Sequence, residues 1–314
     1  MLTFFTTAKP FHGHDGIIQR NALMSWKLLH SDVEVIVFGD DEGAAEVCRE
    51  LGLRHEPQVK RHESGAKYLN YIFARAQELA GREYLCFSNC DIVLMQDFWK
   101  SFEIARRWKK RFLLVGQRWD TDVIEPIDFA RSANWSERLR EFACTKGLQQ
   151  DPHWVDFFLF SKGLYKNMPP LIVGHCYWDN WMIWSALSAN VPVLDASRFL
   201  VPVHQNHGYS AAFGRIKGVP TDALSLLNLA SIGGRQNIRH IKSATNRLNV
   251  TGHIRWNASR YTYESWLARK LGTQTRELVY KVWLPVWHGF LRITRPVRTA
   301  LGLRSRDKRA QIRE

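Results

Sequence analysis

The chain has 314 residues, of which 45% are hydrophobic, and a formal net charge of +14 at pH 7. This length suits one large α/β domain with an appendage, or two small domains. Its five cysteines are scattered and include no CxxC pair, which argues against a disulfide framework or a zinc ribbon. The start of the chain lacks the features of a signal peptide, and no apolar run has membrane-span length, so we expect a cytoplasmic protein.

Regular patterns alternate through the first hundred residues. They predict strands over residues 2–7, 33–38 and 84–94 and helices over residues 17–30, 44–51 and 68–80. This β-α-β-α order predicts an α/β fold with a mainly parallel central sheet flanked by helices, which is a Rossmann-like arrangement.

The second half of the chain is less regular. Further strands are predicted over residues 111–116, 155–160, 191–195 and 199–203. Residues 118–150 are polar and aromatic, which indicates loops and a short helix that could form a flap. Residues 262–301 have a mostly helical pattern broken at Pro285 and near Pro296.

Several common nucleotide and hydrolase motifs are missing. The sequence contains no GxGxxG, no GxxxxGK[ST] and no GxSxG. Dinucleotide binding, P-loop phosphoryl transfer and α/β-hydrolase chemistry therefore lose their usual support.

Three polar clusters follow predicted strands at their carboxyl ends. They are residues 6–9 (Thr-Thr-Ala-Lys), residues 40–42 (Asp-Asp-Glu) and residues 89–91 (Asn-Cys-Asp). Ligands of doubly wound sheets bind at this edge, so the coincidence predicts one site. Side-chain alternation would put Asn89 and Asp91 on the same side of the chain, where their oxygens suit a hard divalent cation. The alternative is that Asp91 only caps a turn between two strands.

With Asn89-Cys90-Asp91 at a strand end, residues 1–210 resemble the GT-A fold glycosyltransferases, whose D-x-D motif binds a cation against the donor diphosphate. The resemblance implies that Asp91 is a direct ligand of Mn²⁺ or Mg²⁺, and that Asn89 contacts ribose or the metal shell. It also implies a catalytic domain over residues 1–215, with a nucleotide-sugar half (1–100) and an acceptor half (101–215), and an extension over residues 216–314. Further donor-binding residues implied by the resemblance are Thr6, Thr7, Lys9, Asp40, Asp41 and Lys67.

A pair of histidines follows the predicted strand at residues 199–203. Many GT-A enzymes supply a late histidine to the same metal, so His204 and His207 are both candidate ligands. The sequence does not choose between them, and two loop histidines bonded to the backbone are the alternative.

A second cluster surrounds the start of a predicted helix after Pro169-Pro170. The resemblance implies that Asp179, near that helix start, is the base of an inverting transferase, while a helix cap is the alternative. Trp178 and Asn180 are candidate acceptor-binding residues, although a tryptophan here is as often core. Asp156, an acid in an apolar strand, is a further acceptor-binding candidate or a hydrogen-bonded, half-buried acid.

The basic charge is concentrated in the tail. Residues 255–314 contain 14 Lys and Arg against 4 Asp and Glu. Tryptophan and arginine on a broken amphipathic helix over residues 280–303 suit an anionic membrane surface, so the protein is expected to be peripheral at the inner membrane face. A helix packed on the catalytic domain is the alternative, and no nucleic-acid-binding module is recognisable.

Together these patterns and the resemblance to GT-A enzymes predict a metal-assisted glycosyltransferase. Its donor would be a nucleoside diphosphate sugar, with a UDP-sugar favoured, and its acceptor a hydroxyl of a glycan or lipid-linked intermediate. Three alternatives remain open. They are a sugar nucleotidyltransferase, a metal-dependent hydrolase using His12, His14, Asp15 and His204, and a non-catalytic scaffold that binds membranes or polyanions.

Overall fold

The computed structural model describes residues 1–130, 134–207, 220–259, 261–262 and 266. The chain divides into two compact units, Met1–Thr262 and Tyr263–Glu314. The first unit is described below. Apart from residues 262 and 266, the helical pattern predicted over residues 262–301 lies outside the described residues, and so does the predicted membrane-binding segment.

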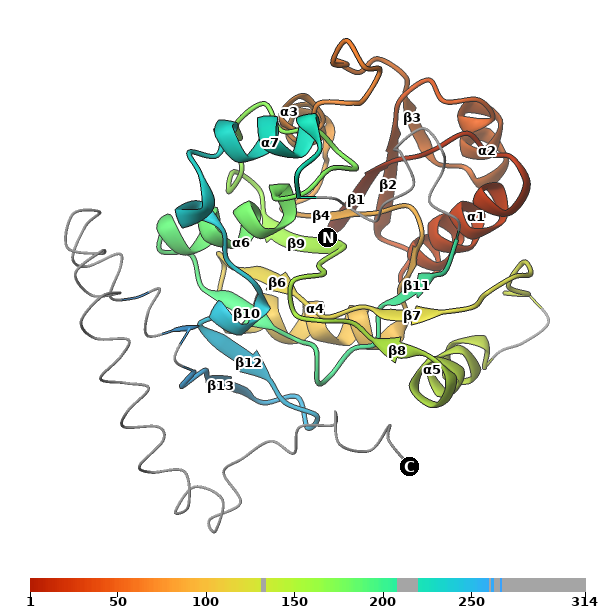
Figure 1. Ribbon diagram of the computed structural model, residues 1–314. Coiled ribbons are helices and arrows are strands. Elements are labelled where there is room, and N and C mark those ends of the chain that lie inside the picture. Colours follow the sequence, from red (N-terminus) through yellow and green to blue (C-terminus); the bar gives the residue numbers. More distant parts are fainter. Residues whose placement is uncertain (131–133, 208–219, 260, 263–265, 267–314) are drawn as a thin grey trace, which may run out of the picture. The chain divides into compact units, whose positions relative to one another are not determined.

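A nine-stranded sheet runs through the first unit (Figure 1). Its order is β13 (Ile254–Trp256), β12 (Asn246–Leu248), β10 (Val193–Asp195), β6 (Leu113–Val115), β9 (Phe157–Ser161), β4 (Tyr84–Ser88), β1 (Leu2–Thr7), β2 (Val33–Phe38) and β3 (Arg54–Glu56). Neighbours are parallel except that β9 is antiparallel to β4 and β6, and β13 is antiparallel to β12. The predicted α/β fold with a mainly parallel sheet is confirmed.

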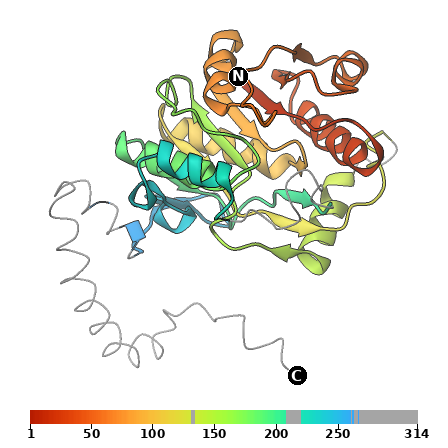
Figure 2. The same cartoon turned by 45° about the horizontal axis from the view of Figure 1, so that its top comes forward.

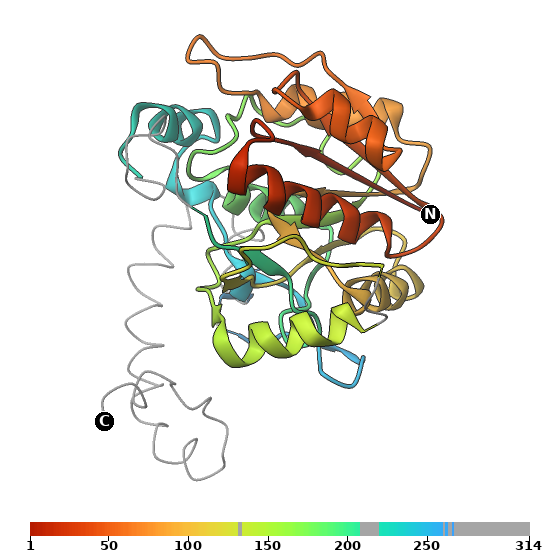
Figure 3. The ribbon, with the colours of Figure 1, turned by 90° about the vertical axis from the view of Figure 1, so that its right-hand side faces the viewer.

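Helices cover both faces of this sheet. Side chains from α1 (Gly13–Lys27), α2 (Ala44–Leu51) and α4 (Gln96–Trp108) pack with Phe4 in one core, and those from α3 (Leu69–Leu79) and α6 (Trp178–Ser188) pack with Phe5 in the other. Adjacent strand residues point to opposite faces, which is why neighbours in β1 belong to different cores. Figure 3 shows α1 lying across the face of the sheet that it covers, and Figure 2 shows α7 (Ala223–Ser231) beside α6.

A second, four-stranded sheet has the order β5 (Ile92–Val93), β11 (Val203–Gln205), β7 (Trp119–Thr121) and β8 (Leu148–Gln149). The strand predicted over residues 84–94 is therefore two strands, β4 and β5, separated by a turn in which the Ile92 amide donates to the Asn89 carbonyl at 3.2 Å. The predicted flap at residues 118–150 holds β7, β8 and the helix α5 (Trp135–Lys146). The strand predicted over residues 199–203 was misplaced, because β11 begins where that prediction ends.

The first unit extends beyond the predicted domain boundary at residue 215. Strands β12 and β13 complete one edge of the large sheet, and the 3₁₀ turns η2 (Arg235–Asn237) and η3 (Ile241–Ser243) lie between α7 and β12. Residues 223–257 thus belong to the same compact unit as β1. Among the described residues, no helix is both long and apolar enough to cross a membrane.

Candidate metal and catalytic site

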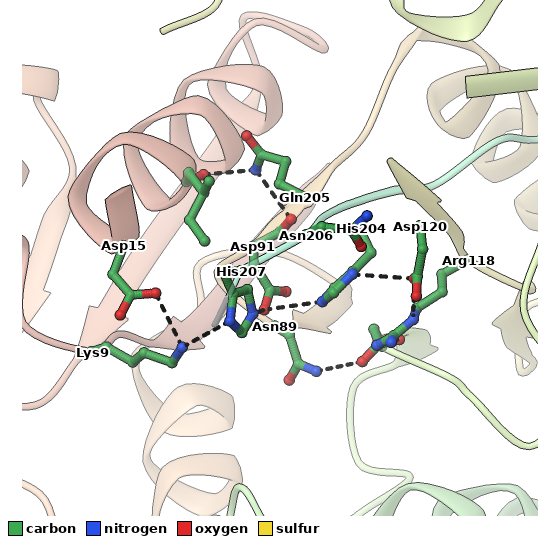
Figure 4. A network of polar contacts seen from close by, with 12 residues as sticks. Lys9, Asp15, Asn89, Asp91, Arg118, Asp120, His204, Gln205, Asn206 and His207 are labelled. Carbon is green, nitrogen blue, oxygen red and sulfur yellow. Dashed lines mark hydrogen bonds and ion pairs between the residues drawn. The ribbon is translucent and has the colours of Figure 1, made fainter. Parts of the chain in front are cut away.

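Strand pairing brings Asp91 and His204 together although they are far apart in the sequence. Asp91 lies in the turn between β4 and β5, and β11 pairs with β5 so that His204 is opposite Ile92. The Gln205 amide also donates to the Asp91 carbonyl at 3.2 Å. His207 follows two residues after the strand and turns back toward the same carboxylate (Figure 4).

Three side chains converge at this turn. The Asp91 Oδ2 atom lies 3.0 Å from His207 Nε2 and 3.6 Å from His204 Nε2. One ligand atom from each residue lies within 4.8 Å of the other two. The other carboxylate oxygen, Asp91 Oδ1, is buried and has no hydrogen-bond partner among the described residues. An orphaned carboxylate oxygen beside two imidazoles fits a divalent cation, and both histidines left open by the sequence are in reach.

The surroundings keep Asp91 ionised. Burial by itself would raise its pKa, but the electrostatic interaction with His204 and the hydrogen bond from His207 outweigh burial and hold the pKa well below its usual value. A carboxylate that stays charged at neutral pH is what a cation site requires.

A network of ion pairs continues from His204 through residues that the sequence analysis missed. Parallel pairing places His204 opposite Asp120 on β7, and His204 Nδ1 lies 3.2 Å from Asp120 Oδ1. Arg118, which is 4% exposed, lies 2.8 Å from Asp120 through Nε and 3.0 Å from Asp156 Oδ2 through Nη1. The spacing of Arg118 and Asp120, two residues apart beside a strand, was the available signal, since it places both on one side.

The same network includes Asn89. Its side-chain amide donates to Asp156 Oδ1 at 2.6 Å, and its backbone amide donates to the Asp156 carbonyl at 2.9 Å, next to the β4–β9 ladder. Both carboxylate oxygens of Asp156 are thus engaged, one by Asn89 and one by Arg118. The amide at position 89 therefore satisfies an acid that a second aspartate there would repel.

A buried glutamine fixes the ligand-bearing strand against α1. The Gln205 side chain donates to the carbonyls of Ile18 at 2.8 Å and Asp91 at 3.1 Å, and it accepts from Asn21 at 2.9 Å. Gln205 is fully buried, so losing these bonds would leave polar groups without partners. The sequence did not mark Gln205 as a buried, hydrogen-bonded residue, because glutamine is common on surfaces.

The expected donor-binding residues on β1 lie at the same edge of the sheet. Thr6 is buried, and the buried Thr7 hydroxyl has no hydrogen-bond partner among the described residues. Lys9 Nζ lies 3.1 Å from Asp15 Oδ1 and 3.4 Å from His207 Nδ1. The first strand therefore reaches the metal cluster, as its place in the sheet requires.

The acids after β2 are paired with basic groups. Asp41 pairs with Lys67, which is 5% exposed and donates to the Ala8 carbonyl at 2.8 Å. Burial lowers the pKa of Lys67, and the neighbouring Asp41 opposes that shift. Asp40 is exposed and pairs with Arg61, whose hydrogen bond lowers the pKa of Asp40. This group lies beside β1, because Lys67 contacts Ala8 just after that strand.

Asp179 occupies the first turn of α6. The cap position is Tyr177, in the left-handed conformation at φ 82°, so Asp179 is inside the helix and does not cap it. Burial raises the pKa of Asp179 to about 7, and the nearby charge of Asp156 adds to this effect. A carboxylate with that pKa can accept a proton at neutral pH.

The two residues flanking Asp179 have different surroundings. Trp178 is 6% exposed and packs against Phe87 and Phe158, with ring centroids 5.5 and 5.6 Å away, so the core role that the sequence left open accounts for it. Asn180 donates from its side-chain amide to the His153 carbonyl at 3.1 Å and remains partly exposed.

The residues suggested for a hydrolase centre are not assembled. His12 pairs with Glu42 on the surface, and His14 Nε2 contacts the Asn206 carbonyl at 3.0 Å. Asp15 is engaged by Lys9. Within the part of the chain that the structure describes, Asp91, His204 and His207 form the one metal-competent group of this kind.

Comparison with known proteins gives distant structural similarities. No protein-family model and no curated protein matches the chain. TarS 1-349 of S. aureus in complex with UDP-GlcNAc is similar at a TM-score of 0.46 and 11% identity, over 68% of this chain and 61% of that one. Glucosyl-3-phosphoglycerate synthase of Mycobacterium tuberculosis with Mn²⁺, UDP and phosphoglyceric acid gives 0.40 and 11%, over 66% and 71%. The chain thus spans about three fifths of the TarS fragment.

Proposed function

We propose that this protein is a nucleotide-sugar glycosyltransferase that moves a sugar from a nucleoside diphosphate sugar, with UDP favoured, to a hydroxyl acceptor. The observation that carries the proposal is the convergence of Asp91, His204 and His207 at the carboxyl end of β4. Donors bind at this edge of an open α/β sheet.

The three converging side chains are the proposed ligands of Mn²⁺ or Mg²⁺. When bound, the cation would stabilise negative charge on the departing diphosphate. The protein's own contribution is to hold Asp91 ionised and to fix His204 through Asp120 and Arg118.

The donor nucleotide is proposed to lie along the ends of β1 and β2. Its base and ribose would contact Thr6, Thr7 and the acids Asp40 and Asp41, and its diphosphate would attract Lys9 and Lys67. The side-chain amide of Asn89 donates to Asp156, and the same amide would also hydrogen-bond to the donor ribose. This assignment places the sugar next to the N-terminal turn of α6.

Asp179 is the proposed base. Its carboxylate would take the proton of the acceptor hydroxyl as that oxygen bonds to the anomeric carbon and the bond from this carbon to the diphosphate oxygen breaks. Attack opposite the leaving group inverts the anomeric centre. Asp156 and Asn180, which is partly exposed, would bind the acceptor.

The acceptor is proposed to be a glycan or a lipid-linked intermediate, with the basic tail held at an anionic membrane surface. This part of the proposal rests on the charge of residues 255–314.

Binding and product analysis test the proposal together. Calorimetry with UDP-, GDP- and CMP-sugars, with and without Mn²⁺, should show donor binding that depends on the cation and is lost in Asp91→Asn. If no nucleotide sugar binds under any condition, the transferase proposal is wrong. NMR of the product then tests the base, because a retained anomeric configuration would exclude that role for Asp179.

A further inference from the structure

Lys9 has an unusual place beside the metal cluster. Its ammonium lies between Asp15 Oδ1, at 3.1 Å, and His207 Nδ1, at 3.4 Å (Figure 4). Gln19 fixes its backbone through two hydrogen bonds: the Lys9 amide donates to Gln19 Oε1 at 2.7 Å, and the Gln19 side-chain amide donates to the Lys9 carbonyl at 3.1 Å. The side chain is 37% exposed, so it can move while its backbone stays in place.

The contacts on the His207 ring select one tautomer. A lysine ammonium has only donors, so Nδ1 of His207 must be the acceptor in this contact. The proton of the neutral ring is then on Nε2, which faces Asp91 Oδ2 at 3.0 Å and can donate to it. Lys9 on one side and Asp91 on the other therefore favour the same form of the ring.

A cation bound at His207 Nε2 needs the opposite tautomer. The nitrogen must offer its lone pair, so the ring proton moves to Nδ1, where it would face the Lys9 ammonium as a second donor. Metal-bound histidines usually donate this N–H to a carboxylate, carbonyl or water. Asp15, on the far side of Lys9, is a carboxylate that could accept this N–H once Lys9 has moved away.

We propose that Lys9 and the divalent cation are alternative partners of His207, so that loading the cation displaces the Lys9 ammonium. The inference rests on the proposed function, because the donor diphosphate is the new partner that Lys9 would find at this edge. Cation and nucleoside diphosphate then bind with positive coupling, since each favours the position of Lys9 that the other needs. The cation alone binds weakly.

Substitution of Lys9 separates this role from a structural one. We would titrate the full chain with Mn²⁺, following the free ion by electron paramagnetic resonance, with and without UDP. Lys9→Met and Lys9→Gln should bind Mn²⁺ about tenfold more tightly than the wild type without UDP, on the scale of removing a charge a few Å from a cation. Both should bind UDP more weakly. Lys162→Met is the matched control, because Lys162 follows β9 at the opposite end of the strands.

The tautomer provides a second, direct measurement. ¹⁵N NMR of histidine-labelled protein, with His207 assigned by its loss in His207→Gln, should show Nε2–H without metal and Nδ1–H with diamagnetic Mg²⁺ and UDP. An Nδ1–H ring in the metal-free wild type overturns the inference. The inference is also overturned if both Lys9 variants bind Mn²⁺ no more tightly than the wild type does. Failure of the proposed function looks different, because then no variant would bind Mn²⁺ even with UDP present.

Discussion

The regions around Asp91 and Asp179 shift the pKa of a carboxylate in opposite directions. Both are partly buried, which by itself raises the pKa of each. At the β4–β5 turn, two imidazoles and the more distant Arg118 reverse the effect of burial, and the pKa of Asp91 falls well below its usual value. At the start of α6 the neighbouring charge is the carboxylate of Asp156, and the pKa of Asp179 rises to about 7.

The difference separates two chemical roles. A carboxylate that remains charged can hold a cation, whereas one that titrates near neutrality can exchange a proton during the reaction. Asp156 and Arg118 act electrostatically on Asp179, and Arg118 also acts on Asp91, so the two regions share one network. Substituting Asp91 and substituting Asp179 should therefore give defects that can be told apart.

The largest effect is expected from Asp91→Asn, which removes the charged member of the comparison. The cation should no longer bind, and kcat should fall about 10³-fold, the scale of losing a group that stabilises transition-state charge. Steady-state kinetics and Mn²⁺ titration would measure both changes. Asp32→Asn, at a partly exposed acid near the other end of the strands, should leave both unchanged. Full activity of Asp91→Asn would exclude the metal assignment.

Asp179→Asn should reduce kcat about 10²-fold or more, within the range of general-base catalysis, while Mn²⁺ binding persists. Asp179 must be ionised to accept a proton, and its pKa is about 7. The wild-type kcat should therefore rise with pH through about 7 and level off above it, and this limb should vanish in the variant. A limb that persists in Asp179→Asn would assign the base to another group.

The same substitution should also change the free energy of unfolding, and the size of this change should depend on pH. The folded-state pKa of Asp179 is raised from 3.8 to about 7, so this group favours the folded state below pH 3.8 and loses that contribution as pH rises through 7. Asp179→Asn removes the cost of burying a charge. Urea denaturation at pH 8 should show the variant to be more stable than the wild type, with little difference near pH 4. Equal stabilities at pH 8 would contradict the raised pKa.

Local sequence patterns predicted much of the first half of the fold. The strands at residues 2–7 and 33–38 and the helix at residues 44–51 were predicted with the observed bounds. The helix is flanked by Gly43 and Gly52, both in the left-handed region, where other residues would be strained. The polar residues 89–91 were also found at a strand end, and the turn between two strands that the sequence left open is the one between β4 and β5.

The site was harder to predict because long-range pairing assembles it. β11 has three residues, and its contacts with β5 and β7 determine that His204 faces both Asp91 and Asp120. No periodicity within so short a strand reports its partners. Gln205 gave no signal for the same reason, since its role appears only once the second sheet has formed.

The smallest effect is expected at position 89, where the two regions meet. Asn89→Asp would restore a D-x-D motif, but it replaces a 2.6 Å hydrogen bond to Asp156 with two carboxylates in contact. The loss should be about 1–3 kcal/mol in the free energy of unfolding without metal, measured by urea denaturation.

The double variant Asn89→Asp with Asp156→Asn exchanges the donor and the acceptor of this hydrogen bond. It should recover part of the lost stability, while Asp156→Asn alone should lose the ion pair from Arg118 at 3.0 Å. Additive losses in the double variant would show that the two side chains do not act as a pair. Recovery would instead show that Asn89 and Asp156 act as a pair, in which the amide at position 89 is needed because Asp156 supplies the acid.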